Sequence, residues 1–157
     1  MTFSLAALSD LAAIAARLPG ADDTAARTAR DRQASLTKPP GSLGRLEEIA
    51  EFMAAWRGTP RPEIWKAQAL VFAGNHGVCA QGVNPYPQQV TGQMVANFRA
   101  GGAAINQLCR VNGADLDVIA LDLDRPTGDF TQVSAMSEAE TLDALNRGAA
   151  AVDPGGD

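Results

Sequence analysis

Leu70-Val71-Phe72-Ala73-Gly74-Asn75-His76-Gly77-Val78 is the stretch that decides the fold of this chain. Its first part belongs to a short apolar run, 67–73, which is typical of a buried strand. Its second part is a glycine-rich turn that carries the chain's single histidine. A second run of this kind, 116–123, follows two stretches of helical spacing, 88–99 and 103–111, so the pattern predicts a parallel strand–helix–strand unit.

Helical spacing also predicts the elements on either side of this unit. Helices are expected over 4–18, 22–36, 43–57 and 137–148, with the last capped by Ser137 and by Glu140 three residues later. The third is expected to turn Leu46, Ile49, Ala50 and Met53 inward, and the helix over 88–99 to turn Val90, Met94, Val95 and Phe98 inward. The proline-rich break near residue 60 predicts a helical segment, 1–62, followed by an α/β segment, 63–157.

The composition is that of a globular protein of one domain's length. The 157 residues carry a net charge of −5, which argues against a general nucleic-acid surface. No apolar run approaches the length of a membrane span, and no basic leader precedes the first helix. Two cysteines make no disulfide framework, so a reduced cytoplasmic setting is expected.

Polar side chains gather after the first strand, where an α/β sheet binds its ligands. Asn75 and His76 lie in the turn, and Asn84, Tyr86, Gln88 and Gln93 lie on the next loop and the start of the next helix. Few polar anchors of this kind suit a pocket for a flat, largely apolar heterocycle. The alternative is an ordinary polar loop with helix-capping residues. Asp122 or Asp124 could reach a ligand from the end of the second strand.

The second unusual stretch is Lys38-Pro39-Pro40-Gly41-Ser42-Leu43-Gly44-Arg45-Leu46-Glu47. Ser42 is expected to cap the third helix, whose start could hold an anion or contact a neighbouring subunit. The alternative is a proline-stiffened linker between two helices.

His76 and Cys79 have a spacing that also occurs in metal and thiol–imidazole sites. Structural zinc needs four ligands, and the chain has three cysteine and histidine residues in all, so no metal site is predicted. A Cys79–His76 hydrolase is a weaker alternative, since such a nucleophile also needs an orienting group.

Several stretches resemble the nicotinate-nucleotide–dimethylbenzimidazole phosphoribosyltransferases of cobalamin biosynthesis. The stretch from Lys38 to Glu47 is similar to the N-terminal signature of this family. Residues 71–83 resemble its V-F-A-[GA]-[DN]-H-G-V segment and the residues after it. Further similar blocks cover 86–98 and 101–106, and the resemblance runs in order from about residue 30 to residue 150.

The resemblance implies a fold, a reaction and a set of contacts. The expected fold is a Rossmann-like parallel sheet with flanking helices, plus an N-terminal helical part of a small domain. The expected reaction transfers phosphoribose from nicotinate mononucleotide to 5,6-dimethylbenzimidazole in a homodimer, with no metal or cofactor. By position, Asn84, Tyr86 and Gln93 fall in the benzimidazole-binding region, Gln88 is an alternative to Gln93, and Asn75 and His76 lie at the pocket floor.

Family members are about twice as long, and their phosphate motif and catalytic glutamate lie beyond the stretch that is matched here. We therefore expect an incomplete fold with no catalytic residue in this chain, which is inactive alone and self-associates through open strand edges. The competing interpretation is a non-catalytic benzimidazole-binding or regulatory module.

Overall fold

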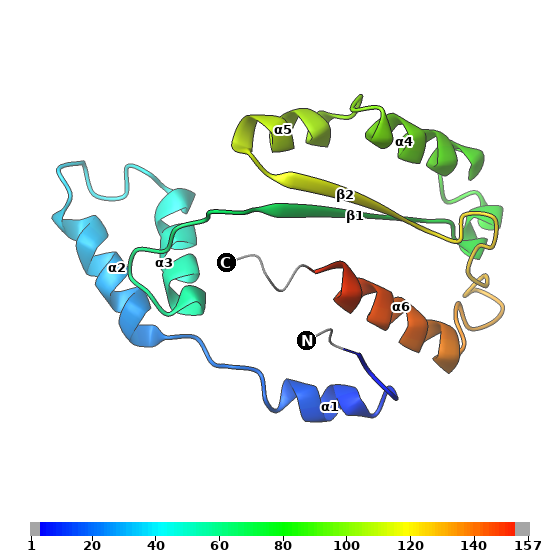
Figure 1. The fold of residues 1–157 in the computed structure, drawn as a ribbon, viewed down its shortest axis with the longest axis horizontal. Helices are drawn as coiled ribbons and strands as arrows, with labels where there is room; N and C mark the ends of the chain where they lie inside the picture. Colours follow the sequence, from blue (N-terminus) through cyan, green and yellow to red (C-terminus); the bar gives the residue numbers. More distant parts are fainter. Residues whose placement is uncertain (1–3, 153–157) are drawn as a thin grey trace. The chain divides into compact units, whose positions relative to one another are not determined.

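A computed structural model describes residues 4–152 of the chain and divides them into two compact units. One unit combines the described residues up to Leu11 with those from Trp65 onward, and the other is Ala12–Ile64. The first unit contains both strands, while the second contains helices α2 and α3 (Figure 1).

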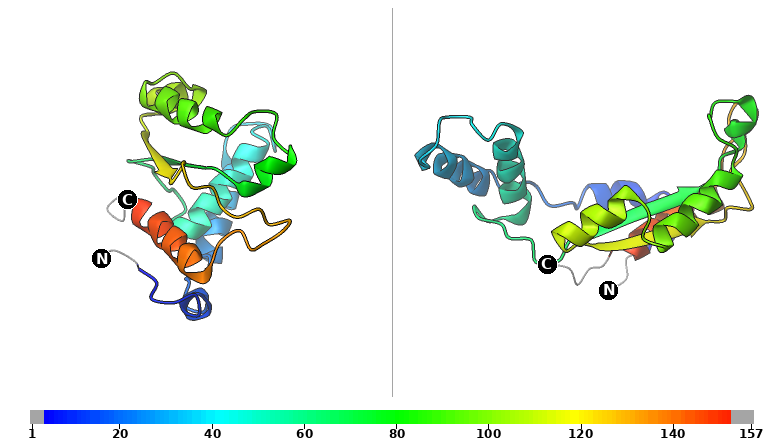
Figure 2. Two further views of the ribbon diagram at one scale, coloured as in Figure 1. Left: turned by 90° about the vertical axis from the view of Figure 1, so that its right-hand side faces the viewer. Right: turned by 90° about the horizontal axis from the view of Figure 1, so that it is seen from above.

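Two parallel strands organise the larger unit. Strand β1 (Gln68–Gly74) pairs with β2 (Asp115–Leu121), from Gln68 opposite Asp115 to Gly74 opposite Leu121. The 3-10 helix η1 (Gly77–Gln81), α4 (Gln89–Arg99) and α5 (Ala104–Asn112) connect the strands, and α6 (Glu138–Ala151) follows β2. Helices α4 and α5 lie on one face of the sheet and α6 on the other (Figures 1 and 2). The predicted parallel α/β arrangement is therefore confirmed.

The connecting helices turn small apolar faces toward the sheet. Val95 of α4 and Cys109 of α5 are buried, with exposed fractions of 4% and 8%. Helix α5 ends at Gly113, whose φ of +66° favours glycine and whose N–H donates to the Cys109 carbonyl. Met94, which was expected to face inward, is exposed instead, because the inward stripe of this short helix is centred on Val95.

The first helix is much shorter than the predicted 4–18. Helix α1 covers Asp10–Ala15, because the Asp10 carboxylate accepts the backbone N–H groups of Ala6 and Ala7 and holds them in turns. Before these turns, the backbone of Leu5 makes two hydrogen bonds to Asn146 of α6. The Leu5 side chain is 5% exposed, so this segment is part of the α/β unit.

The smaller unit is a pair of helices, α2 (Asp23–Ser35) and α3 (Arg45–Arg57). Asp22 caps α2 by accepting the N–H groups of Thr24 and Ala25. Ala25, Ala29 and Ala54 are the buried residues of this helix pair, and their small side chains allow the helices to approach closely. The inward face predicted for α3 is wrong in part. Leu46 and Ile49 are exposed, since the face toward α2 is centred on Ala54.

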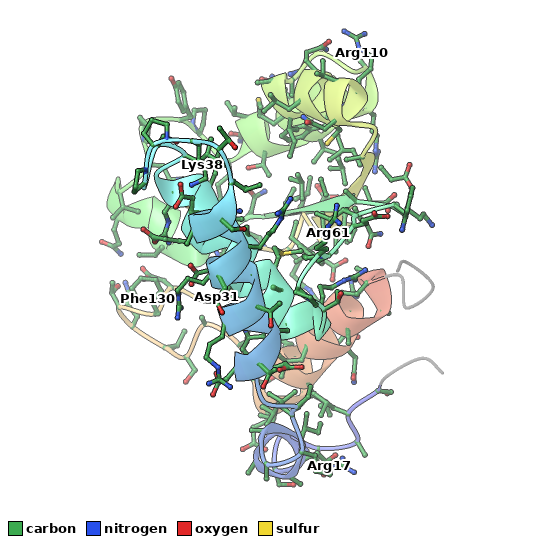
Figure 3. The ribbon with its side chains drawn as sticks, turned by 90° about the vertical axis from the view of Figure 1, so that its left-hand side faces the viewer. Arg17, Asp31, Lys38, Arg61, Arg110 and Phe130 are labelled. Atoms are coloured by element: carbon green, nitrogen blue, oxygen red, sulfur yellow. The ribbon has the colours of Figure 1, made fainter. Side chains whose placement is uncertain are left out.

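The loop between these helices is held by a lysine and a glutamate rather than by Ser42. Lys38 Nζ lies 2.6 Å from Glu47 Oε1, which also accepts the Leu43 N–H at 3.2 Å. Helix α3 begins after Gly44, whose φ of +53° lies in the left-handed region, so the predicted cap by Ser42 is wrong. Figure 3 labels Lys38 on this loop. The side chains of the pair are 15% and 19% exposed, so the loop has its own small polar core.

This ion pair should make the stability of the helical unit depend on pH. The hydrogen bonds from Lys38 and from the Leu43 N–H lower the pKa of Glu47 below its ordinary value. A carboxylate with a lowered folded-state pKa stabilises the fold above its unfolded pKa, and this contribution is lost as pH falls through the folded value. Melting temperatures measured from pH 7 to pH 2 should fall in the acid range, and Glu47→Gln should flatten that dependence. The exposed Glu48→Gln is the control, and an equal flattening there would contradict the assignment to Glu47.

Candidate functional site at the carboxyl ends of the strands

The polar turn after β1 is joined to the loop after β2 by backbone hydrogen bonds. The Thr127 N–H donates to the Asn75 carbonyl at 3.2 Å, and the Gly77 N–H donates to the Thr127 carbonyl at 2.9 Å. His76 and Thr127 thus form an isolated parallel bridge beyond the sheet proper. A Cβ on Gly77 would lie 2.4 Å from the Thr127 oxygen, so only glycine fits there.

The Asn75 side chain is held from both sides. Its Nδ2 donates to the Leu123 carbonyl at 2.8 Å, and its Oδ1 accepts the Thr91 hydroxyl at 2.7 Å. One amide therefore joins the end of β1, the loop after β2 and the first turn of α4. The sequence analysis did not single out Thr91 as a partner of Asn75, since nothing in the spacing distinguishes it from any other helix residue.

His76 lies where the turn after β1 meets the loop after β2; it is exposed, and its carbonyl accepts two hydrogen bonds. Its oxygen accepts the Gln88 side-chain amide at 2.9 Å and the Cys79 N–H at 3.1 Å. The half-buried Gln88 is thereby turned back toward the strand instead of capping α4. His76 is one of the residues that line the cavity next to the strand ends.

The remaining candidates lie on the outer loop and helix. Asn84, Tyr86 and Gln93 are exposed, with Tyr86 at 68%. Asn84 Nδ2 donates to the Cys79 sulfur at 3.0 Å, so the thiol is paired with an amide in the described structure. These three side chains lie outside the cavity lining, while Asn75 and His76 are in it.

A cavity of about 680 Å³ opens between the strand ends and α6. Its charged lining is made by Asp122, Arg125, Glu140, Asp143 and Arg147. Asp122 follows β2 with a φ of +41°, which is uncommon for a residue other than glycine. The Arg125 guanidinium lies 3.3 Å from its carboxylate and that of Arg147 lies 3.8 Å away. Asp122, one of the two aspartates that the sequence analysis considered at the end of this strand, therefore lines the cavity, and neither arginine was among the predicted residues.

Two carboxylates fix the loop between β2 and α6. The Ser137 N–H and hydroxyl donate to Glu140, which lowers its pKa. Gln81 and Thr131 donate to Asp129 and lower its pKa as well. Asp129 thus ties the loop to η1, and the neighbouring Phe130 is exposed on the loop's outer side (Figure 3). Both carboxylates are ionised near neutral pH.

In the part of the chain that the structure describes, no helix has the length and apolar character needed to cross a bilayer.

The parallel strands have helices on both faces, which places the chain among the α/β proteins. In such proteins the carboxyl ends of the strands, where the polar loops of this chain lie, are the usual position of a ligand site. A family model described as Phosphoribosyltransferase matches residues 18–156. Because this match covers most of the chain, the chain belongs to that phosphoribosyltransferase family.

Named relatives agree with this assignment. The chain is 67% identical over 149 residues to a nicotinate-nucleotide–dimethylbenzimidazole phosphoribosyltransferase of Rhodobacter capsulatus, covering 95% of this chain and 45% of the relative. It is 58% identical over 153 residues to the enzyme of the same name from Ruegeria, covering 98% of this chain and 46% of the relative. The sequence resemblance is confirmed.

A solved structure supports the fold. The crystal structure of the enzyme of this name from Thermus thermophilus is 38% identical, with a TM-score of 0.68, covering 80% of this chain and 43% of that chain. The chain spans somewhat less than half the length of the relatives that it matches.

Proposed function

We propose that this chain provides the base-binding part of an enzyme that transfers phosphoribose from nicotinate mononucleotide to 5,6-dimethylbenzimidazole. The observation that carries this proposal is the 67% identity to a relative named for that reaction. The polar residues at the carboxyl ends of the strands support it, because a planar heterocycle needs only a few polar anchors beside an apolar surface.

The proposed phosphoribosyl transfer requires no acid or base catalyst from the residues described here. An imidazole nitrogen of the benzimidazole attacks C1′ of the ribose, and the bond to the pyridinium nitrogen breaks with its electron pair going to nicotinate. Because the leaving group is already cationic, its departure needs no acid. The incoming base loses its N–H proton to a general base, which we assign to none of the described residues. Attack opposite the leaving group inverts the anomeric carbon and gives α-ribazole 5′-phosphate.

Within this scheme the predicted site residues fall into two groups. We assign contact with the heterocycle to His76, Asn84, Tyr86 and Gln93, whose side chains are exposed at one end of the sheet. Asn75 and Gln88, whose amides bond to the neighbouring loops, complete the wall behind them. We further propose a homodimer in which the unit Ala12–Ile64, which makes up most of the predicted segment 1–62, belongs to a small domain. We also propose that this chain does not turn over alone.

Binding and turnover test separate parts of this proposal. Calorimetric titration with 5,6-dimethylbenzimidazole should show binding, and Tyr86→Ala or Gln93→Ala should weaken it about tenfold through loss of a stacking or hydrogen-bonding contact. Gln107→Ala, which removes an exposed glutamine from α5, is the control and should leave the affinity unchanged.

The same protein should then be incubated with both substrates and analysed for α-ribazole 5′-phosphate. Binding without product is the expected result. Rapid product formation would refute the proposal that the chain is inactive alone. Absence of benzimidazole binding would refute the assignment of the base-binding wall.

A further inference from the structure

We propose that Thr91 is a positioning residue, which acts through Asn75 to fix the start of helix α4, and the site side chains that it carries, against the strand ends. This inference rests on the proposed function for its ligand, although its structural part is independent of it. Thr91 contributes a single hydroxyl, and its contact with Asn75 at 2.7 Å is a side-chain bond between two different elements.

The Asn75 amide has one orientation that satisfies both of its neighbours. The Leu123 carbonyl can only accept a hydrogen bond, so Nδ2 must face it. Oδ1 must therefore face α4, where the Thr91 hydroxyl is the donor that meets it. Both residues are half-buried, so loss of the hydroxyl would leave a partly buried acceptor unpaired.

Helix α4 depends on this contact because its N-terminus has no side-chain cap. Gln88 occupies the cap position, but its amide reaches back to the His76 carbonyl. Gln88 and Thr91 lie three residues apart, on the same side of the first turn. Two side-chain hydrogen bonds, from Gln88 and from Thr91, thus hold this turn against the segment formed by Asn75 and His76. The same two bonds fix the positions of the polar loop 82–88 and of Gln93, which adjoin this turn.

Matched threonine substitutions isolate the hydroxyl. Thr91→Val removes the donor at nearly constant volume, and Thr91→Ser keeps it. Thr141→Val is the control, since the Thr141 hydroxyl donates to the Ser137 carbonyl within the first turn of α6 and is also half-buried. The backbone amides of Val90 and Thr91 donate to the Pro87 and Gln88 carbonyls just before α4, so their hydrogen exchange reports the opening of its first turn.

In the unliganded chain, Thr91→Val should speed exchange of these two amides about tenfold relative to amides in α5, and Thr91→Ser should restore the wild-type rate. The dissociation constant for 5,6-dimethylbenzimidazole should rise about tenfold in Thr91→Val and recover in Thr91→Ser. Thr141→Val should leave both the exchange of these two amides and the dissociation constant unchanged.

The two readouts keep the proposals apart. Unchanged exchange in Thr91→Val, or a serine variant that behaves like the valine variant, would overturn the positioning role. Faster exchange with an unchanged dissociation constant would also overturn it, because the site would then not depend on the anchorage. If the wild-type chain does not bind 5,6-dimethylbenzimidazole, the proposed function fails, and exchange alone decides whether Thr91 anchors α4.

Discussion

Replacing Gly77 by alanine should lower the free energy of unfolding of the α/β unit by about 3 kcal/mol, the upper part of the range for overpacking a tight site. The added methyl group would lie 2.4 Å from the Thr127 oxygen, 2.6 Å from the Asp129 nitrogen and 2.8 Å from the Gly128 carbon. All three are backbone atoms, so no side-chain rotation relieves the clash. The loop after β2 must move away from the turn after β1.

Gly92→Ala is the matched control for this substitution. Gly92 lies inside α4 with open space around the position of a Cβ, so alanine there should stabilise the helix by about 0.5–1 kcal/mol. Urea denaturation followed by circular dichroism measures both changes. Equal stability of Gly77→Ala and the wild type would show that the close approach of the two loops is not needed for the fold. Gly77→Ala should also abolish benzimidazole binding if the proposed site is correct.

The second large effect is expected at Asn146, where Asn146→Ala should cost about 2 kcal/mol. Its Oδ1 accepts the Leu5 N–H at 2.7 Å and its Nδ2 donates to the Leu5 carbonyl at 3.0 Å. Each such bond contributes about 1 kcal/mol, and losing both leaves the backbone of a buried residue unpaired. Leu5 should then leave its place against the α/β unit.

Limited proteolysis of the segment before Asp10, together with urea denaturation, tests this expectation. Asn146→Asp keeps the acceptor and loses the donor, so its effect should fall between those of the wild type and Asn146→Ala. Asn112→Ala removes an exposed side chain whose amide donates to the Leu108 carbonyl within its own helix, and it should change stability little. Unchanged protease protection in Asn146→Ala would contradict the expectation that Asn146 holds the Leu5 segment in place.

Continuous apolar runs were sufficient to place both strands, and apolar residues at helical spacing were sufficient to place most helices. The structure puts β1 at Gln68–Gly74 against the predicted 67–73, and Ser137 with Glu140 caps α6 as expected. Periodicity failed at the ends of α1 and α3. There, side-chain carboxylates bond to backbone N–H groups outside the helix, Asp10 to Ala6 and Ala7, and Glu47 to Leu43. Nothing in an apolar pattern indicates such bonds.

The sequence predicts those parts of the candidate site that follow directly from the order of elements along the chain. It does not predict those that depend on contacts between distant segments. Asn75 and His76 lie at the strand end because a glycine-rich turn follows an apolar run. The partners of Asn75 come from α4 and from the loop after β2, so Thr91 and Leu123 could be found only in three dimensions. Arg147 of α6 meets Asp122 for the same reason, whereas Arg125 lies only three residues beyond Asp122 in the chain.

The register of the two strands has a consequence for how the chain reaches its native state. Gln68 pairs with Asp115 and Gly74 with Leu121, so every rung of the ladder closes a long loop. Neither strand has another partner within residues 4–152, so no shorter hairpin can form first. Because loop closure costs entropy before any pairing offsets it, the intervening helices should become ordered early and the ladder late. Folding kinetics of this unit should therefore be slow for its size, with helical signal preceding strand protection.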